Sequence, residues 1–341
     1  MKLETVLKEL CYASGVNGVY DASKTAEQYL SAYTNDIHRD ALGNVWGFLP
    51  SVSNAPTLLL EAHIDEIGFT VSSIDEQGFL HLSACGGVDN RTLSSASVTV
   101  LTQPPINGVF CAVPPHLSKK DEKTPELSER GVDVGMTKEE AEANIPLGTR
   151  AVFSPHFECL LNKTVCSKAL DNRAGVAAIL QTLEYLKDKE LPVRLAVAFC
   201  TQEELGLRGS RTAAFSIRPD AAVSVDVSFA HTPDADRCEC GILGKGVMLG
   251  ISPALDSDIT ASFRQLANEN NLPLQYEVMG DSTGTNADVI SITAEGIPTG
   301  LVSIPLRYMH TPVEVVSLQD IDNTAKLLSA FVLKGGVCSH D

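Results

Sequence analysis

The order of apolar and polar positions along the chain predicts buried strands alternating with amphipathic helices. Four short runs are apolar without strict alternation, which is typical of strands buried on both faces of a sheet: 57–62, 195–200, 221–225 and 300–304. Between and around these runs, the pattern predicts helices over residues 1–11, 23–33, 174–187, 256–270 and 318–333. The alternation favours an α/β fold with a mixed central sheet and helices on both of its faces.

The stretch from residue 70 to residue 160 follows a different pattern. It is rich in Val, Thr, Ser, Gly and Pro, with strand-like runs at 97–102 and 108–113 and one short helix capped by Thr137. We therefore predict a small β-barrel-like domain over residues 70–160. It would be inserted into an α/β domain made of residues 1–69 and 161–341.

Composition and charge narrow the class of protein. The chain has 341 residues, which favours two domains, and its 44% hydrophobic and 20% charged residues are ordinary for a globular protein. It carries 43 acidic and 26 basic side chains, a formal charge of −17. Such a surface repels nucleic acid and anionic membranes, so we expect neither as a partner. A site that holds divalent cations would also concentrate carboxylates.

The N-terminal residues mix charged and apolar side chains and lack the apolar segment and cleavage signature of a signal peptide. No apolar run approaches the ~20 residues that a membrane-spanning helix needs. The nine cysteines are an odd number, and without a secretory signal they do not predict a disulfide framework. We expect a soluble cytoplasmic protein.

The first candidate for chemistry is His63, which directly follows the run 57–62. In open α/β sheets, ligands bind beyond the carboxyl ends of the strands, and a histidine at this position faces that region. Asp65 could accept a hydrogen bond from the second ring nitrogen, as carboxylates behind metal-binding histidines do. A histidine at a strand end is more often satisfied by a loop, so this pair alone is weak evidence.

Acidic residues stand at two further element boundaries. Asp171 precedes the helix predicted from residue 174, where it could be a helix cap and nothing more. Glu203 and Glu204 follow the run 195–200, and adjacent carboxylates repel each other unless a positive charge offsets them. One glutamate bound to a metal and the other free as a base is a sensible division of roles.

Two more candidates complete the set. Asp226 ends the predicted strand 221–225, and His310 follows the predicted strand 300–304. Five candidate ligands thus map to one edge of one predicted sheet: His63, Asp171, Glu204, Asp226 and His310. Nitrogen and oxygen ligands without thiolates suit zinc, cobalt or manganese. Each residue is weak evidence alone, but their agreement predicts a metal site.

The motifs around these residues, and their order along the chain, resemble those of a family of dinuclear metallopeptidases. This family comprises the glutamyl, leucyl and deblocking aminopeptidases that assemble as hollow tetrahedra. The resemblance covers nearly the whole chain and rests on five segments: 62–68, 169–173, 202–209, 226–228 and 307–312. It implies a metal-dependent aminopeptidase that removes N-terminal residues from peptides by means of a water bound to two metals.

The resemblance also implies how the ligands divide between two divalent metal ions, which would be zinc or cobalt, with manganese a further option. His63 and Asp226 would hold one ion. Glu204 and His310 would hold the other, and Asp171 would bridge the two.

Further roles follow from the same resemblance. Glu203 would be the general base, and Asp65 would orient the imidazole of His63. The inserted β-domain is similar to the family's dimerisation and assembly domain, which implies a homo-oligomer, a dodecamer built from dimers. One departure is Asn286, because relatives often carry an aspartate there; we expect this loop to lie near the peptide substrate.

The residues alone leave other functions open. Spacing does not distinguish an aminopeptidase from a dinuclear amide deacylase or a carboxypeptidase. A glycoside hydrolase needs two carboxylates roughly 5–9.5 Å apart and would leave His63 and His310 without a role. A non-catalytic metal-binding scaffold would not need a free base such as Glu203, so the sequence favours an enzyme.

Overall fold

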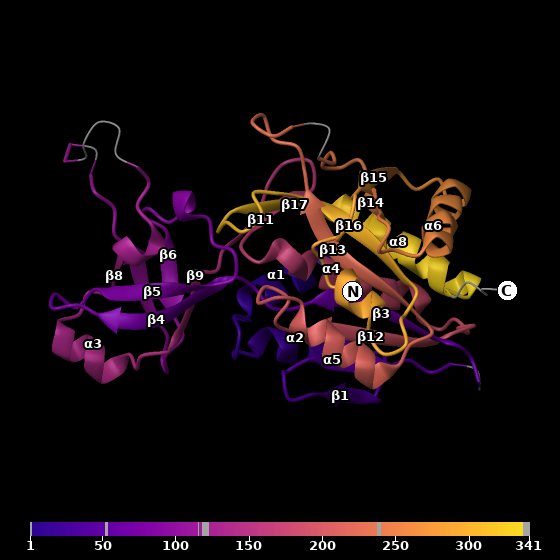
Figure 1. Ribbon diagram of the computed structural model, residues 1–341, viewed down its shortest axis with the longest axis horizontal. Helices are drawn as coiled ribbons and strands as arrows, with labels where there is room; N and C mark the ends of the chain where they lie inside the picture. The colour runs from indigo at the N-terminus through magenta and orange to yellow at the C-terminus, as the bar shows by residue number, and fades with distance from the viewer. Residues whose placement is uncertain (1, 52–53, 115, 118–122, 237–239, 337–341) are drawn as a thin grey trace.

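The molecule consists of a large sheet flanked by helices and a separate barrel at one end of it (Figure 1). The computed structural model describes residues 2–51, 54–114, 116–117, 123–236 and 240–336. The large sheet has 11 strands and is mixed, and the barrel is closed. The predicted fold class, α/β with a mixed sheet and a small β-barrel, is therefore confirmed.

The helices of the described residues are α1 (Leu3–Tyr12), α2 (Asp21–Leu30), α3 (Lys138–Asn144), α4 (Leu170–Leu186), α5 (Arg208–Ile217), α6 (Ser257–Glu269), α7 (Ala287–Ser291) and α8 (Leu318–Lys334), with the 3-10 helices η1 (Asn90–Thr92) and η2 (Leu127–Glu129). All five helices predicted from the apolar pattern are present, as α1, α2, α4, α6 and α8. Their ends differ from the predicted ends by a few residues.

The strands of the large sheet are β1 (Ile37–Arg39), β2 (Val45–Phe48), β3 (Thr57–His63), β10 (Phe157–Cys159), β11 (Thr164–Ser167), β12 (Arg194–Cys200), β13 (Ala221–Phe229), β14 (Val247–Ile251), β15 (Leu274–Val278), β16 (Thr299–Arg307) and β17 (Glu314–Ser317). Their order is β1-β2-β12-β3-β13-β16-β17-β11-β10, with β14 beside β16 and β15 beside β14. The four runs that predicted buried strands are β3, β12, β13 and β16, and they lie next to one another in parallel.

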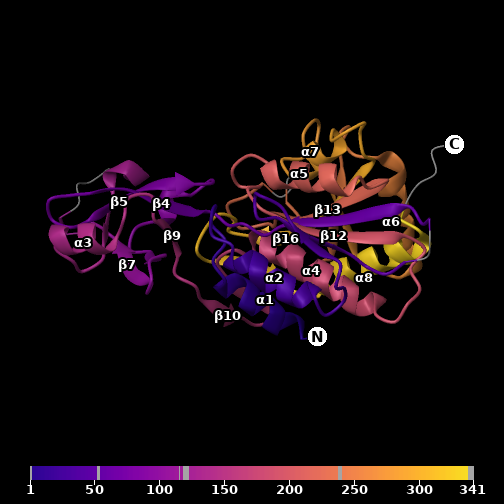
Figure 2. The ribbon, with the colours of Figure 1, turned by 90° about the horizontal axis from the view of Figure 1, so that it is seen from below.

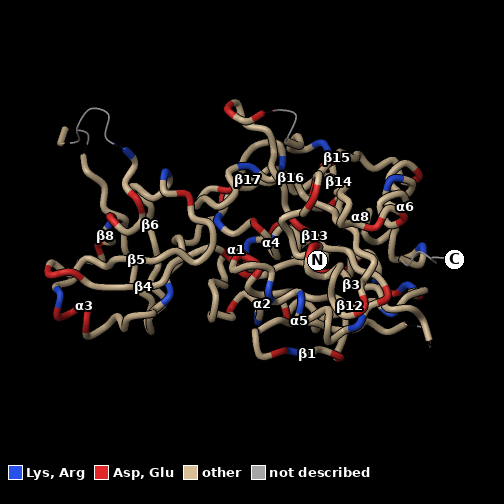
Figure 3. The backbone as a smooth tube through the Cα atoms, in the orientation of Figure 1, with Lys and Arg blue, Asp and Glu red and all other residues tan. Residues whose placement is uncertain are grey.

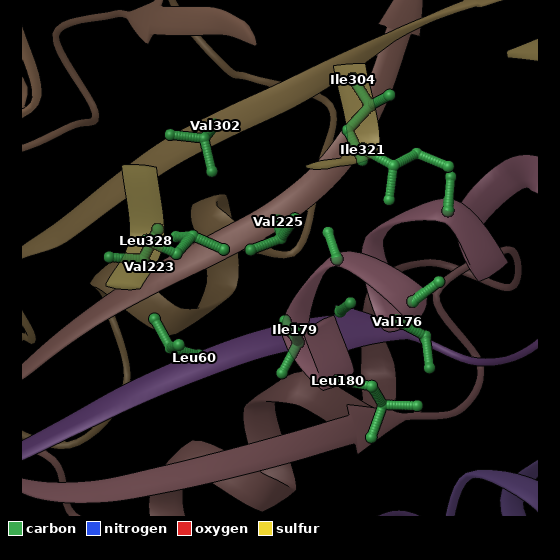
Figure 4. Packing of buried hydrophobic residues seen from close by; sticks show 14 of the residues in the cluster. Leu60, Val176, Ile179, Leu180, Val223, Val225, Val302, Ile304, Ile321 and Leu328 are labelled. Carbon is green, nitrogen blue, oxygen red and sulfur yellow. The ribbon is translucent and has the colours of Figure 1, made fainter. Parts of the chain in front are cut away.

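Helices cover both faces of the large sheet, as predicted; Figure 2 shows α5 and α7 on one side and α1, α2, α4 and α8 on the other. The face of the sheet under α4 and α8 packs on these helices through residues such as Leu60, Val223, Ile179 and Leu328. These side chains point toward one another in Figure 4. The opposite face, which includes Leu59 of β3, packs on α5 and α7. Because both faces are covered, the central strands β3, β12, β13 and β16 are buried along nearly their whole length instead of at alternate residues.

The barrel consists of β4 (Gly68–Ile74), β5 (Leu80–Cys85), β6 (Ser97–Val100), β7 (Ile106–Phe110), β8 (Gly131–Asp133) and β9 (Arg150–Phe153), in the order β4-β5-β8-β7-β6-β9. It has its own core, in which the rings of Phe110 and Phe153 lie 5.2 Å from that of Phe69. β7 begins two residues before the predicted strand 108–113, because Val100 and Ile106 pair to close the hairpin.

The chain leaves the large sheet after β3 and returns to it at β10. The division into domains at residues 70 and 160 stays a prediction, since β10 lies before residue 160 yet pairs in the large sheet. Thr137 caps α3 as predicted, because its hydroxyl accepts a hydrogen bond from the N–H of Glu140.

Acidic residues are spread over the barrel and the helix-covered sheet alike (Figure 3). The acidic excess of the sequence is therefore a property of the whole surface and is not explained by one cluster. Among the described residues, no helix combines the length and the apolar character that crossing a membrane requires.

Candidate metal centre

The predicted ligands gather at the carboxyl edge of the four central parallel strands. His63 is the last residue of β3, and Cys200, the last residue of β12, is its partner in register. Glu203 and Glu204 lie in the loop that follows Cys200, the last residue of β12. Because parallel strands end at the same edge, the segments that follow them converge there, as the sequence predicted.

Asp226 reaches the site from within a strand, so the prediction that it ends one is wrong. β13 continues to Phe229 because its parallel pairing with β16 extends to Phe229 and Leu306. The Asp226 side chain is buried, and its Oδ1 also accepts a hydrogen bond from the N–H of Val227.

The first group of possible ligands is His63, Asp171 and Asp226, all of them buried. The Nε2 atom of His63 lies 3.0 Å from Oδ1 of Asp171 and 3.7 Å from Oδ1 of Asp226. One imidazole nitrogen thus faces oxygens from two separate parts of the chain.

The second group is Asp171, Glu204 and His310. The Nε2 atom of His310 lies 3.5 Å from Oδ2 of Asp171 and 3.4 Å from Oε1 of Glu204. Asp171 therefore belongs to both groups and turns a different carboxylate oxygen toward each. This is the arrangement expected of a ligand shared by two cations.

Local structure explains why the Asp171 carboxylate is available. The sequence left open that Asp171 is merely a helix cap, but Asn172 has that role, since its Oδ1 accepts a hydrogen bond from the N–H of Gly175. The backbone of Asp171 is not helical, with φ −78° and ψ 104°. The side chain is consequently free to face the two histidines.

Asp65 lies behind the site, as the sequence suggested, and has a second set of contacts that the sequence did not suggest. Its Oδ1 lies 3.5 Å from Nδ1 of His63, within ion-pair distance but too long for a good hydrogen bond. Its two oxygens also accept hydrogen bonds from the backbone N–H groups of Glu203 and Glu204, at 3.1 and 3.2 Å. Asp65 therefore fixes both glutamates as well as facing the histidine.

The electrostatics of the site are those of an excess of buried negative charge. Burial raises the pKa of Glu203 to about 8, and the neighbouring carboxylates of Glu204 and Asp171 act in the same direction against the opposing effect of His63. Burial likewise raises the pKa of Asp226 well above its usual range. Hydrogen bonds to Asp171 and Glu204 raise the pKa of His310 to about 11.

These features fit divalent cations. Crowded carboxylates favour any positive charge placed among them, and two imidazoles with three carboxylates supply the nitrogen and oxygen ligands that zinc and related metals accept. Among the residues that the structure describes, every group of three or more possible metal ligands lies in this one site, including the third group, His63, Glu203 and Glu204.

Comparison with known proteins agrees with this geometry. The family model of the M42 glutamyl aminopeptidases matches residues 43–327 of the chain. The chain belongs to the M42 glutamyl aminopeptidase family. It is therefore a metal-dependent hydrolase that acts on peptide bonds.

Relatives of this M42 aminopeptidase match it over nearly its full length. The lysyl aminopeptidase of Pyrococcus furiosus is 32% identical over 341 residues, which cover 96% of each chain. The structure of an aminopeptidase from the archaeon Desulfurococcus kamchatkensis is 32% identical, covers 98% of this chain and 95% of its own, and superposes with a TM-score of 0.91.

Two structures of the Pyrococcus horikoshii TET1 peptidase, 28% and 29% identical, each cover 98% of this chain and 100% of their own with a TM-score of 0.85. One is a dodecamer in its asymmetric unit. The other is described as able to assemble into a tetrahedron or a large octahedral shell.

The M42 aminopeptidase has a buried acid at the site, Glu314, to which sequence reasoning gave no role. Glu314 accepts hydrogen bonds from the backbone N–H of Asp171 at 3.1 Å and from that of His310 at 2.9 Å. It thus holds two of the three candidate ligands of the second group in place. The available signal was an acid at the start of the fully buried strand β17, four residues after His310.

A buried ion-pair network supports the opposite side of the site. Glu66 follows Asp65 and accepts hydrogen bonds from Nζ of Lys168 at 2.5 Å and from the N–H of Gly15 at 2.9 Å. The guanidinium of Arg173 lies 3.7 Å from Glu66 and donates to the carbonyl of Leu10. The end of α1 is thereby tied to the segment that carries Asp171.

The side chain of Asn286 is buried beside the strand that leads to His63. Its side chain is 1% exposed, donates to Oε1 of Glu61 at 2.7 Å, and accepts a hydrogen bond from the hydroxyl of Ser210. Glu61 is on β3, two residues before His63. The Asn286 side chain therefore contacts the strand that carries His63, and the location of its loop near the peptide substrate stays a prediction.

Proposed function

We propose that this M42 aminopeptidase uses two divalent cations, zinc or cobalt or else manganese, to remove N-terminal residues from peptides. The proposed ligands are His63, Asp171, Glu204, Asp226 and His310. The observation that carries the proposal is the position of Asp171, whose two oxygens face Nε2 of His63 and Nε2 of His310 separately. A site for a single ion would not require one carboxylate between two ligand groups.

The roles of the ligands follow from these contacts. His63 and Asp226 would bind one cation, Glu204 and His310 the other, and Asp171 both. When bound, two cations would supply an activated water and polarise the scissile carbonyl of the peptide. Asp65 would orient His63 and keep Glu203 and Glu204 in register through their backbone N–H groups.

Glu203 would be the general base. It shares a group with His63 and Glu204, so its carboxylate lies at the edge of both proposed cation positions. Its carboxylate lies beside His63 and Glu204 and can accept a proton, as a general base must. Glu203 would take a proton from the attacking water and give it to the amine that leaves.

The choice of an aminopeptidase over other amide hydrolases rests on family membership. The relatives named above are aminopeptidases, whereas the ligand set by itself would also serve an amide deacylase or a carboxypeptidase. A glycoside hydrolase is not favoured, because the imidazoles of His63 and His310, which face Asp171, would have no role in it.

An assay with aminoacyl p-nitroanilides tests the proposed function. We expect the protein to hydrolyse substrates with a free amino group, to lose this activity when stripped by a chelator, and to regain it with Zn²⁺ or Co²⁺. The N-acetylated twin of the best substrate is the control and should be cleaved far more slowly. Equal cleavage of the two would indicate a deacylase or an endopeptidase instead.

We further propose that the barrel over residues 70–160 is an assembly domain and that the protein forms a dodecamer built from dimers. The proposal is supported by the dodecamer reported for the TET1 peptidase, which matches this chain across its whole length. Sedimentation velocity should give the mass of about twelve chains of 36.4 kDa each. A monomer that retains full activity would contradict the proposal.

A further inference from the structure

The barrel approaches the metal centre through two adjacent glycines. Gly86 and Gly87 directly follow β5 of the barrel and precede η1, and we call this pair the glycine strap. Gly86 has a φ of +87°, a left-handed conformation that side chains rarely adopt. The strap thus belongs to the barrel by its place in the chain and meets Ile67 of the barrel core, yet it also lies against Glu204 and His310 of the α/β part of the molecule.

The strap lies against both ligands proposed for the second cation. A methyl group on Gly87 would come within 2.9 Å of Nδ1 and 3.2 Å of Cε1 of His310. A methyl group on Gly86 would come within 3.2 Å of Oε2 of Glu204 and 2.8 Å of a methyl of Ile67. Only residues without a side chain fit at these two positions without displacing their neighbours.

The His310 imidazole, which stays partly exposed, therefore lies between the strap on one edge and the acids on the other. Gly87 covers the Nδ1 edge of the ring, while Nε2 on the opposite edge faces Asp171 and Glu204. The backbone of His310 is fixed as well, because its N–H donates to Glu314. A push from the strap on the Nδ1 edge would favour rotation of the ring, which would carry Nε2 away from the two carboxylates.

From these contacts we propose that the glycine strap is a positioning element through which the barrel sets the affinity of the Glu204–His310 cation position, and not of the His63–Asp226 position. The proposal rests on the proposed function, since it assumes two cations. Its physical basis is that ligands must be held within about 0.5 Å of their binding geometry, and the strap is the surface that fixes one side of His310.

Cobalt titration of chelator-stripped protein tests the strap, read by the visible absorbance of bound Co²⁺ and by calorimetry. Wild type should bind two equivalents. Gly87→Ala should bind the first equivalent as wild type does and the second roughly 10- to 100-fold more weakly, the range typical when support of a ligand is lost. The matched control is Gly280→Ala, an exposed glycine whose added methyl would meet nothing within 4 Å.

Two outcomes separate the strap from the proposed function. If wild type fails to bind two equivalents, the proposed function is contradicted before the strap is considered. If wild type binds two and Gly87→Ala binds both with affinities within about twofold of wild type, the strap proposal is overturned while the proposed function stands.

A double variant keeps the proposal testable should Gly87→Ala fold poorly. In the His310→Ala background the ring is absent, so the methyl of Gly87→Ala has space and should not lower the melting temperature or the affinity for the remaining cation. If Gly87→Ala is equally harmful with and without the His310 ring, the alanine acts through another part of the barrel and the proposal fails.

Discussion

Glu203→Gln should abolish most turnover while leaving both cations bound. Glutamine has the shape of glutamate but cannot accept the proton of an attacking water, and general acid–base catalysis contributes about 10²- to 10⁴-fold to a rate. The backbone N–H of residue 203 would still donate to Asp65, so the loop that carries Glu204 should keep its position. We therefore expect kcat to fall by about this factor with the metal content unchanged.

The measurement compares kcat on an aminoacyl p-nitroanilide with metal content determined by elemental analysis of the same sample. Glu142→Gln, an exposed glutamate on α3, is the matched control and should behave as wild type. A Glu203→Gln enzyme with near-normal turnover would show that another group is the base. A variant that loses its metals would instead make Glu203 a ligand.

Asp171→Asn should have the second-largest effect, because Asp171 is the one residue that belongs to both cation positions. The amide has one oxygen and one nitrogen, so it can no longer offer a carboxylate oxygen to each of two cations at once. A catalytic metal supplies several kcal/mol of transition-state stabilisation, and about 1.4 kcal/mol corresponds to tenfold in rate, so loss of metal should cost roughly 10³-fold or more.

Metal content and turnover of Asp171→Asn, prepared with the same metal supplement as wild type, test this expectation. We predict no more than one bound ion per chain. Asp234→Asn, at an exposed position away from the ligand groups, is the control. Two tightly bound ions in Asp171→Asn would contradict the claim that the Asp171 carboxylate binds both cations, whatever the turnover.

The apolar pattern predicted the edge of the sheet at which the candidate ligands meet. Buried strands such as β3 and β12 are mostly apolar runs, and parallel strands present their carboxyl ends at one edge. A residue that follows such a run, as His63 and Glu204 do, is therefore placed by topology alone. The sequence placed Asp226 at the right edge of the sheet but wrongly at the end of its strand. Pairing between β13 and β16 extends the strand beyond Asp226, and the apolar run does not encode this pairing.

The supporting residues could not be predicted, because their contacts join segments that are far apart in the chain. Asp65 bonds to backbone N–H groups more than 130 residues away, and a backbone donor leaves no trace in the sequence. Glu314 faces Asp171 across 143 residues, and the glycine strap meets His310 from another part of the fold. Pattern and spacing locate residues that follow secondary structure, but not partners brought together by packing.

The most direct test of the account is anomalous diffraction from a crystal of the protein loaded with Zn²⁺, with data collected on both sides of the zinc absorption edge. We predict two peaks per chain at full occupancy, one among His63, Asp171 and Asp226 and the other among Asp171, Glu204 and His310. A single peak in an active sample, or peaks away from Asp171, would contradict the claim that these five side chains hold a pair of cations.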